Sequence, residues 1–227
     1  MNPVLALSRA ELNQLLRNKT TAAMALVLPL ALGAMFLFAT GEPDWTFALS
    51  LQLVTAQGLT VYVSTTATFA ARRQDLSLKR LRSGELSDLA IIVGVLAPCL
   101  LLGLAQCLLL TGIAFAAGAP APANPAGLVI AITGGVAVNA AVGLLTAAFT
   151  ASAEAAQITT APFFFLALGG SIWALSAQSP WVAALPGGAV TTLVRGGEVL
   201  PPLASMVLWT VVAALLGLRY AKWDRRN

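Results

Sequence analysis

The sequence predicts an all-α polytopic membrane protein, in which several helices cross the bilayer. Hydrophobic residues make up 58% of its 227 residues and charged residues only 10%, whereas charged residues alone make up about 25% of a typical water-soluble domain. Its apolar runs reach the length of about 20 residues that a helix needs to cross a bilayer, and the alternating pattern of a membrane barrel is not evident. We therefore expect one membrane domain over residues 1–227.

Charges and Pro/Gly clusters divide the apolar sequence into six expected spans, at about residues 20–40, 46–70, 87–117, 126–150, 156–177 and 203–221. The third span is longer than a bilayer requires, which predicts a tilt or a break near Pro98. The segment 179–202 is too short and too rich in Pro and Gly for another crossing. It is expected to form a re-entrant or surface helix that caps the outer mouth.

The distribution of basic residues predicts the orientation. With six spans, twelve of the 13 Lys and Arg residues fall on one side of the membrane, before the first span, in the loop 71–86 and after the last span. Because cytoplasmic loops are enriched in basic residues, both termini are expected in the cytoplasm. An odd number of spans would break this tally. Abundant Ala and Gly suggest a GC-rich bacterial genome, and hence the bacterial cytoplasmic (inner) membrane.

The segment before the first span, residues 3–18, is amphipathic at helical spacing. Leucines such as Leu5, Leu12 and Leu16 fall on one half of a helix, and Arg9 and Arg17 lie opposite, with Glu11 at the edge. This pattern predicts a helix that lies flat in the cytoplasmic interface. A plain anchor whose arginines extend toward water fits the pattern as well.

The loop 71–86 gathers five basic residues, Arg72, Arg73, Lys79, Arg80 and Arg82. Leu78 and Leu81 share a helical face among these charges, and Ser83-Gly84 would end the run. A short amphipathic helix that docks on a partner is one interpretation. A basic loop attracted to anionic lipid is the other.

Several function classes lack the residues they need. The chain has no His, which leaves little to ligate zinc or haem, and no metal site is expected. The spans carry no Asp, Glu, Lys or Arg at depth, and no pair of catalytic residues, which argues against a proton-coupled carrier or a membrane-embedded enzyme. The basic residues set orientation, so no nucleic-acid partner is expected.

Three stretches of the chain are distinctive: SRAELNQLLRNKTTAAMALVLPLALGAMFLF at the start, ARRQDLSLKRLRSGELSD after the second span and LPGGAVTTLVRGG before the last. Together they resemble the permease subunit of type-2 ABC exporters. Two departures are Arg73-Gln74-Asp75 in place of the commoner Glu-Arg-Glu, and Gly84-Glu85 in place of a frequent Thr-Pro. The order and spacing of the three stretches carry the likeness across nearly the whole chain.

The resemblance implies that the loop 71–86 holds a coupling helix seated on a cytoplasmic ATPase. The implied coupling residues are Arg73, Gln74, Asp75, Leu78, Lys79, Arg80, Leu81 and Arg82. No G-x-x-x-x-G-K-[ST] motif occurs in the chain, so ATP and Mg²⁺ are expected on a separate ATPase, present in two copies with two permeases. The second permease is expected to be another copy of this chain, in a homodimer, although a homologous partner stays open.

Spans 2 and 5 face the central path in similar permeases. The candidate path residues are Gln52, Thr55, Gln57, Thr159, Thr160, Phe163 and Phe164. Aromatic rings beside amides suit an amphipathic, lipid-like, drug-like or peptide cargo. The alternative is that the phenylalanines face lipid. Asn139, among glycines of span 4, is expected to bond a neighbouring helix.

At the outer mouth, Pro186, Arg195 and Glu198 form a candidate gate. Arg195 and Glu198 are three residues apart, and could pair with each other or respond to the charge of the cargo. Two further functions stay open at this stage. One is a haem-exporter-like permease of cytochrome c maturation, and the other is a membrane scaffold that transports nothing.

Overall fold

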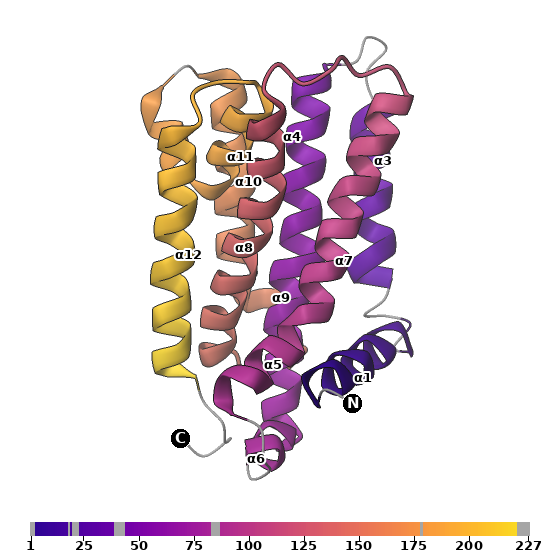
Figure 1. Ribbon diagram of the computed structural model, residues 1–227, viewed down its shortest axis with the longest axis vertical. Coiled ribbons are helices and arrows are strands. Elements are labelled where there is room, and N and C mark those ends of the chain that lie inside the picture. The colour runs from indigo at the N-terminus through magenta and orange to yellow at the C-terminus, as the bar shows by residue number, and fades with distance from the viewer. Residues whose placement is uncertain are drawn as a thin grey trace.

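The protein is a bundle of long helices. A computed structural model describes residues 3–17, 19, 23–38, 44–82, 87–177 and 179–221, and the regular elements among these residues are all helical. The long helices run side by side, and α1 (Pro3–Arg17) lies across one end of the bundle (Figure 1). Five helical stretches are long and apolar enough to cross a membrane: Trp45–Gln74, Asp88–Ala116, Pro125–Phe149, Ala156–Ser176 and Leu200–Tyr220. The prediction of an all-helical, membrane-spanning protein is confirmed at this level.

The first expected span, 20–40, is helical only over part of its length. The π-helix η1 (Ala23–Val27) leads directly into α3 (Leu28–Phe38), of 5 and 11 residues. Together they cover about 24 Å, less than a hydrocarbon core of about 30 Å. The rest of that range lies outside the described residues, so the sixth crossing stays a prediction. Pro29 lacks an N–H and crowds the carbonyl four residues earlier, which favours a widened turn before it.

The helix at the centre of the bundle is longer than expected. The elements α4 (Trp45–Ala56), η2 (Gln57–Val63) and α5 (Ser64–Gln74) join without a break, whereas the predicted span ended at residue 70. In its most apolar stretch 78% of the residues are buried, against 22% for α12 (Leu200–Tyr220). Neighbouring helices therefore shield the polar residues of this central helix from lipid.

The next two spans match the prediction closely. The helices α7 (Asp88–Ala116) and α8 (Pro125–Phe149) begin at N-caps, where Ser87 and Asn124 accept hydrogen bonds from backbone N–H groups. Side-chain oxygens at this position satisfy N–H groups that a helix start leaves unpaired. Of the two alternatives expected for this long span, a break near Pro98 does not occur, since α7 continues through it, and a tilt stays a prediction.

The last third of the chain places a short helix inside the bundle. The helices α9 (Ala156–Thr159) and α10 (Ala161–Ser176) are followed by the 3₁₀ turn η3 (Pro180–Ala184) and α11 (Pro186–Val194). A Cβ on Gly187 would overlap the carbonyl oxygen of Ala167. Glycine therefore lets the backbone of α11 approach α10 closely. The expected helix within 179–202 is present, and most of its residues are buried.

The two ends of the bundle differ in composition. At one end lie α1, the last turn of α5, the short helix α6 (Ser77–Arg82) and the end of α12 (Figure 1). We call this the basic end. At the other end lies the connection between α7 and α8 (Figure 1), and the chain just after α11 meets it there, since a Cβ on Gly196 would contact Ala123. The residues after Ala221, which carry three of the expected cytoplasmic cations, lie outside the described residues.

Candidate docking site at the basic end

The turn between α5 and α6 presents an exposed leucine. Asp75 caps α5, and Leu76 follows with a φ of 57° and 43% of its surface exposed. A bulky residue without glycine's freedom rarely adopts this left-handed conformation. The turn is held by the Ser77 hydroxyl, which donates to the Arg72 carbonyl at 2.9 Å, and by Arg80, whose Nη2 donates to the Asp75 carbonyl at 2.8 Å. Leu76 was not among the predicted coupling residues, because a leucine in such a turn leaves no sequence signal.

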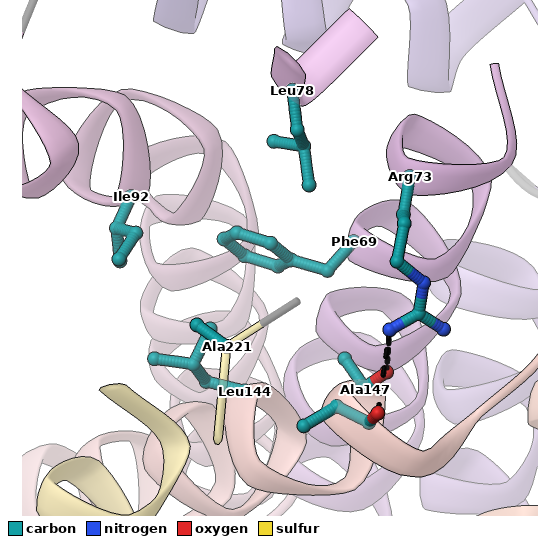
Figure 2. Close-up of a pocket in the computed structure, with 8 residues that line it drawn as sticks. Phe69, Arg73, Leu78, Ile92, Leu144, Ala147 and Ala221 are labelled. Atoms are coloured by element: carbon teal, nitrogen blue, oxygen red, sulfur yellow. Dashed lines mark hydrogen bonds between the residues drawn. The ribbon is translucent and has the colours of Figure 1, made fainter. Parts of the chain in front are cut away.

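The inner side of α6 packs against the protein itself. Leu78 is only 3% exposed and lies in a cluster with Phe69, Ile92 and Leu144, with Leu81 beside it. Figure 2 shows Leu78 pointing toward the Phe69 ring, across a pocket that the end of α12 also borders at Ala221. The predicted contact between Leu78 and a partner would therefore require α6 to leave its seat.

The outer side of α6 offers polar groups to a partner. Asp75 and Arg80 are exposed, and Gln74 is partly exposed at the end of α5. The side chains of Lys79 and Arg82 lie outside the described part of the chain. In this conformation the surface open to a partner therefore includes Leu76, Asp75 and Arg80.

Arg73 is directed into the protein. Its Nη1 donates to the carbonyls of Ala147 at 3.0 Å and Ala148 at 3.4 Å, and its Nη2 donates to the carbonyl of Thr150. Figure 2 shows the guanidinium reaching the end of α8. The last carbonyls of a helix have no partners within it and carry partial negative charge, which a cation stabilises. Arg73 therefore caps α8, so its predicted contact with an ATPase has no exposed surface here.

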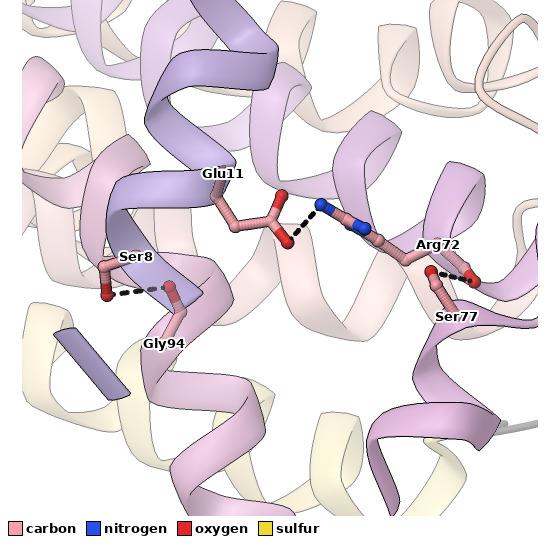
Figure 3. Close-up of polar contacts among 5 residues, drawn as sticks. All are labelled: Ser8, Glu11, Arg72, Ser77 and Gly94. Atoms are coloured by element: carbon pink, nitrogen blue, oxygen red, sulfur yellow. Dashed lines mark hydrogen bonds and ion pairs between the residues drawn. The ribbon is translucent and has the colours of Figure 1, made fainter. Parts of the chain in front are cut away.

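The helix α1 is fixed to the bundle by polar contacts. The Ser8 hydroxyl donates to the carbonyl of Gly94 on α7 at 3.0 Å, and Glu11 forms an ion pair with Arg72 at 2.5 Å (Figure 3). Glu11 is 5% exposed. Sequence analysis noted Glu11 only as an acidic residue at the edge of an amphipathic helix. An acidic residue at that position was the one sequence feature that indicated a basic partner elsewhere in the chain.

The candidate path residues of span 2 lie inside the chain. Gln52, Thr55 and Gln57 are all buried, and Gln57 donates through its Nε2 to the carbonyl of Ala131 at 3.0 Å. Gln52 is 0% exposed, and among the described residues neither its amide oxygen nor its amide nitrogen has a hydrogen-bond partner. Their role in a path stays a prediction, and it requires a conformation in which this centre opens.

The candidates of span 5 divide between surface and interior. Thr159 is exposed and shares a hydrogen bond of 2.9 Å with the Thr150 hydroxyl, whereas Thr160 is buried and bonds its own helix. The Phe163 ring packs against Tyr62 and Trp209, with centroids 4.9 and 5.8 Å apart. These contacts place Phe163 between two helices rather than in lipid.

Phe164 also faces the centre of the bundle. A Cβ on Gly58 would overlap the Phe164 ring, so the ring lies directly against η2. Phe165 is 65% exposed. The alternative that the phenylalanines face lipid therefore stays a prediction for Phe165 alone.

The candidate gate is mixed in character. Pro186 is buried at the first turn of α11, and Arg195 donates to the carbonyl of Leu175 at 3.2 Å. Arg195 and Glu198 are exposed, and the ion pairs within the described ranges do not join them. Asn139 donates to the carbonyl of Gly135 in its own helix, so the expected bond to a neighbouring helix is wrong.

The described residues contain no group of three or more His, Cys, Asp or Glu side chains that could hold a metal ion. No protein-family model matches the chain, and no curated protein matches it.

Proposed function

We propose that this protein is the permease subunit of an ATP-binding-cassette exporter, driven by a separate cytoplasmic ATPase that docks on the turn between α5 and α6. The observation that carries the proposal is the position of α6. This short basic helix directly follows the most buried spanning helix and lies beyond the bundle at the basic end. A displacement of α6 therefore acts on the helix that most others pack against.

The exposed side of this turn suits a protein partner. Leu76 and Arg80 combine an apolar contact with a charge, which favours a cleft lined by apolar and acidic residues. Two of the stretches that carry the resemblance contribute to this end: the first through its α1 part, and the second through the end of α5 and α6. On this proposal the basic end faces the cytoplasm of a bacterium, and ATP and Mg²⁺ bind only to the partner.

The cargo proposed is amphipathic. Gln52 and Gln57 lie in the same central helix as the Gly58 that contacts Phe164. An open state at this position would present amides beside an aromatic ring. The exposed apolar faces of α10 and α12 are available to lipid or to a second copy of the chain.

The test is association with an ATPase encoded beside this chain. Leu76→Asp combined with Arg80→Glu should lower the amount of copurified ATPase at least about tenfold, since it removes both the apolar and the cationic contact. Arg9→Glu, which reverses an exposed charge on α1 at the same end, is the matched control and should leave the association unchanged. Leu78 is unsuitable for this test because its replacement would disrupt the protein's own packing.

Two outcomes would contradict the proposal. One is that no ATPase copurifies with the chain. The other is that an ATPase does bind but hydrolyses ATP at the same rate with and without it, as expected for a membrane scaffold.

A further inference from the structure

Arg72 and Arg73 are neighbours in the last turn of α5, yet they contact different helices. Successive residues of an α-helix point about 100° apart. Arg72 therefore reaches α1, where it pairs with Glu11, while Arg73 reaches the end of α8. We call these two residues the arginine pair.

The arginine pair is also joined directly to α6. The carbonyl of Arg72 accepts the Ser77 hydroxyl, and the carbonyl of Arg73 accepts the N–H of Leu76 at 3.1 Å. Figure 3 shows Arg72 between Ser77 on one side and Glu11 on the other. Its backbone thus contacts the docking turn while its side chain contacts α1.

The contacts of the arginine pair are enclosed by protein. Glu11 and Arg73 are buried, and the side chain of Arg72 is 18% exposed. Separating the ion pair of Glu11 and Arg72 would leave a buried charge without its partner, so this contact resists separation. Beyond α8, the hydroxyl of Thr150 continues the contacts to Thr159 of α9.

We propose that Arg72 and Arg73 are positioning residues, through which a displacement of α6 reaches α1 and α8 at the same time. This inference rests on the proposed function for the source of the displacement. It reassigns Arg73 from a partner contact to an internal one, and it gives the interfacial helix α1 a role in transmission as well as anchoring. Two helices distant in sequence then move with the docking turn.

The experiment measures distances within the full chain, without any ATPase. The chain carries Cys99→Ala and Cys107→Ala and is placed in nanodiscs of phosphatidylethanolamine and phosphatidylglycerol. Spin labels at Arg9→Cys and Arg80→Cys report on α1 against α6, and labels at Ala151→Cys and Arg80→Cys report on the end of α8 against α6. These three sites are exposed. Pulsed dipolar spectroscopy then gives the width of each distance distribution.

Glu11→Gln and Arg72→Gln should each broaden the α1 distribution about twofold, and the double variant should be no broader, because both remove the same contact. The exchange Glu11→Arg with Arg72→Glu should restore most of the narrow distribution. Arg73→Gln should broaden the α8 distribution, and Arg73→Lys should broaden it less because one cation remains. Arg17→Gln, an exposed change on α1, is the control and should alter neither.

Unchanged widths in the Gln variants would overturn the inference, as would a broadening that the charge exchange leaves in place. If a Gln variant fails to fold, Glu11→Asp, which shortens the side chain but keeps its charge, gives the same comparison. The two proposals fail separately. If no ATPase binds, the proposed function is wrong. The measured distance distributions would still test whether the arginine pair holds α1 and α8 to α6.

Discussion

The two ends of this bundle are held together by different interactions. At the basic end, cations make the connections: Arg72 pairs with Glu11, and Arg73 caps α8. From the middle of the bundle toward the opposite end, α11 packs on α10 through the close approach of Gly187 to Ala167, and the charged residues Arg195 and Glu198 stay exposed. Polar connections hold elements at fixed angles yet can exchange partners, whereas glycine contacts tolerate little change in spacing. We therefore expect the basic end to move and the opposite end to stay rigid.

The largest effect is expected at the glycine contact. Gly187→Ala places a methyl group on the carbonyl oxygen of Ala167, so α10 and α11 must separate. The variant should lose about 3 kcal/mol of unfolding free energy, measured by denaturant titration in detergent micelles. Gly169→Ala is the matched control, since nothing lies within 4 Å of its added methyl group. It should be neutral or more stable by about 0.5 kcal/mol. Equal losses of unfolding free energy in both variants would show that the close approach of Gly187 to α10 is not what makes this region rigid.

A smaller loss is expected where a cation caps α8. Arg73→Met keeps much of the apolar length of the side chain but leaves the carbonyls of Ala147 and Thr150 without their donor. The unfolding free energy should fall by about 2 kcal/mol, from the same titration. Arg9→Met, at an exposed position of α1, should cost less than about 0.5 kcal/mol. A loss no larger at Arg73 than at Arg9 would show that the cap contributes nothing.

A gain is expected at the centre of the bundle, between the two ends. Gln52 is enclosed with both amide atoms unpaired, which is unfavourable in this conformation. Gln52→Leu should raise the unfolding free energy by about 1 kcal/mol, because it removes a buried polar group that has no partner. If Gln52 also lines an opened path, the same variant should export less cargo. A stability loss in this variant would show that the amide is satisfied in the native state.

The smallest effect is expected from the charges of the opposite end. Arg195→Gln and Glu198→Gln should each change the unfolding free energy by less than about 0.5 kcal/mol, since both side chains are exposed. Export measured for each variant then isolates any role as a gate. A stability loss above about 1 kcal/mol would mean that these residues hold the end together after all.

Hydrophobicity predicted the long helices well but not where the central one ends. The residues Ala71 to Gln74 were expected in a loop, yet they continue the helix because neighbouring helices, not lipid, surround it. Hydropathy identifies helices that are surrounded by lipid. A helix surrounded by other helices can be more polar, so hydropathy does not show where it ends. The two Arg residues at its end were therefore assigned to the loop.

The short helix of the candidate site was predicted at the right place in the sequence, but its contacts were not. The basic loop indicated the short helix that became α6, and its spacing placed Leu78 on one face. Which face turns inward depends on packing against Phe69 and Ile92, which lie on other elements. Likewise the helical period sets the angle between Arg72 and Arg73, but the partners at each angle come from segments distant in sequence. Sequence periodicity therefore predicts neither the inward face of α6 nor the partners of the two arginines.

The π-helical turn η2 lies in the central helix above the arginine pair. A π turn contains about one residue more than an α turn, so everything after it is rotated about the helix axis relative to an unbroken helix. If the same residues of 57–63 were wound as an unbroken α-helix, the lower half of the helix would be turned by about 100°. Arg72 would then leave Glu11, and Arg73 would leave the end of α8. The extra residue of the π turn thus sets the direction in which Arg72 and Arg73 point, and both of their contacts depend on that direction.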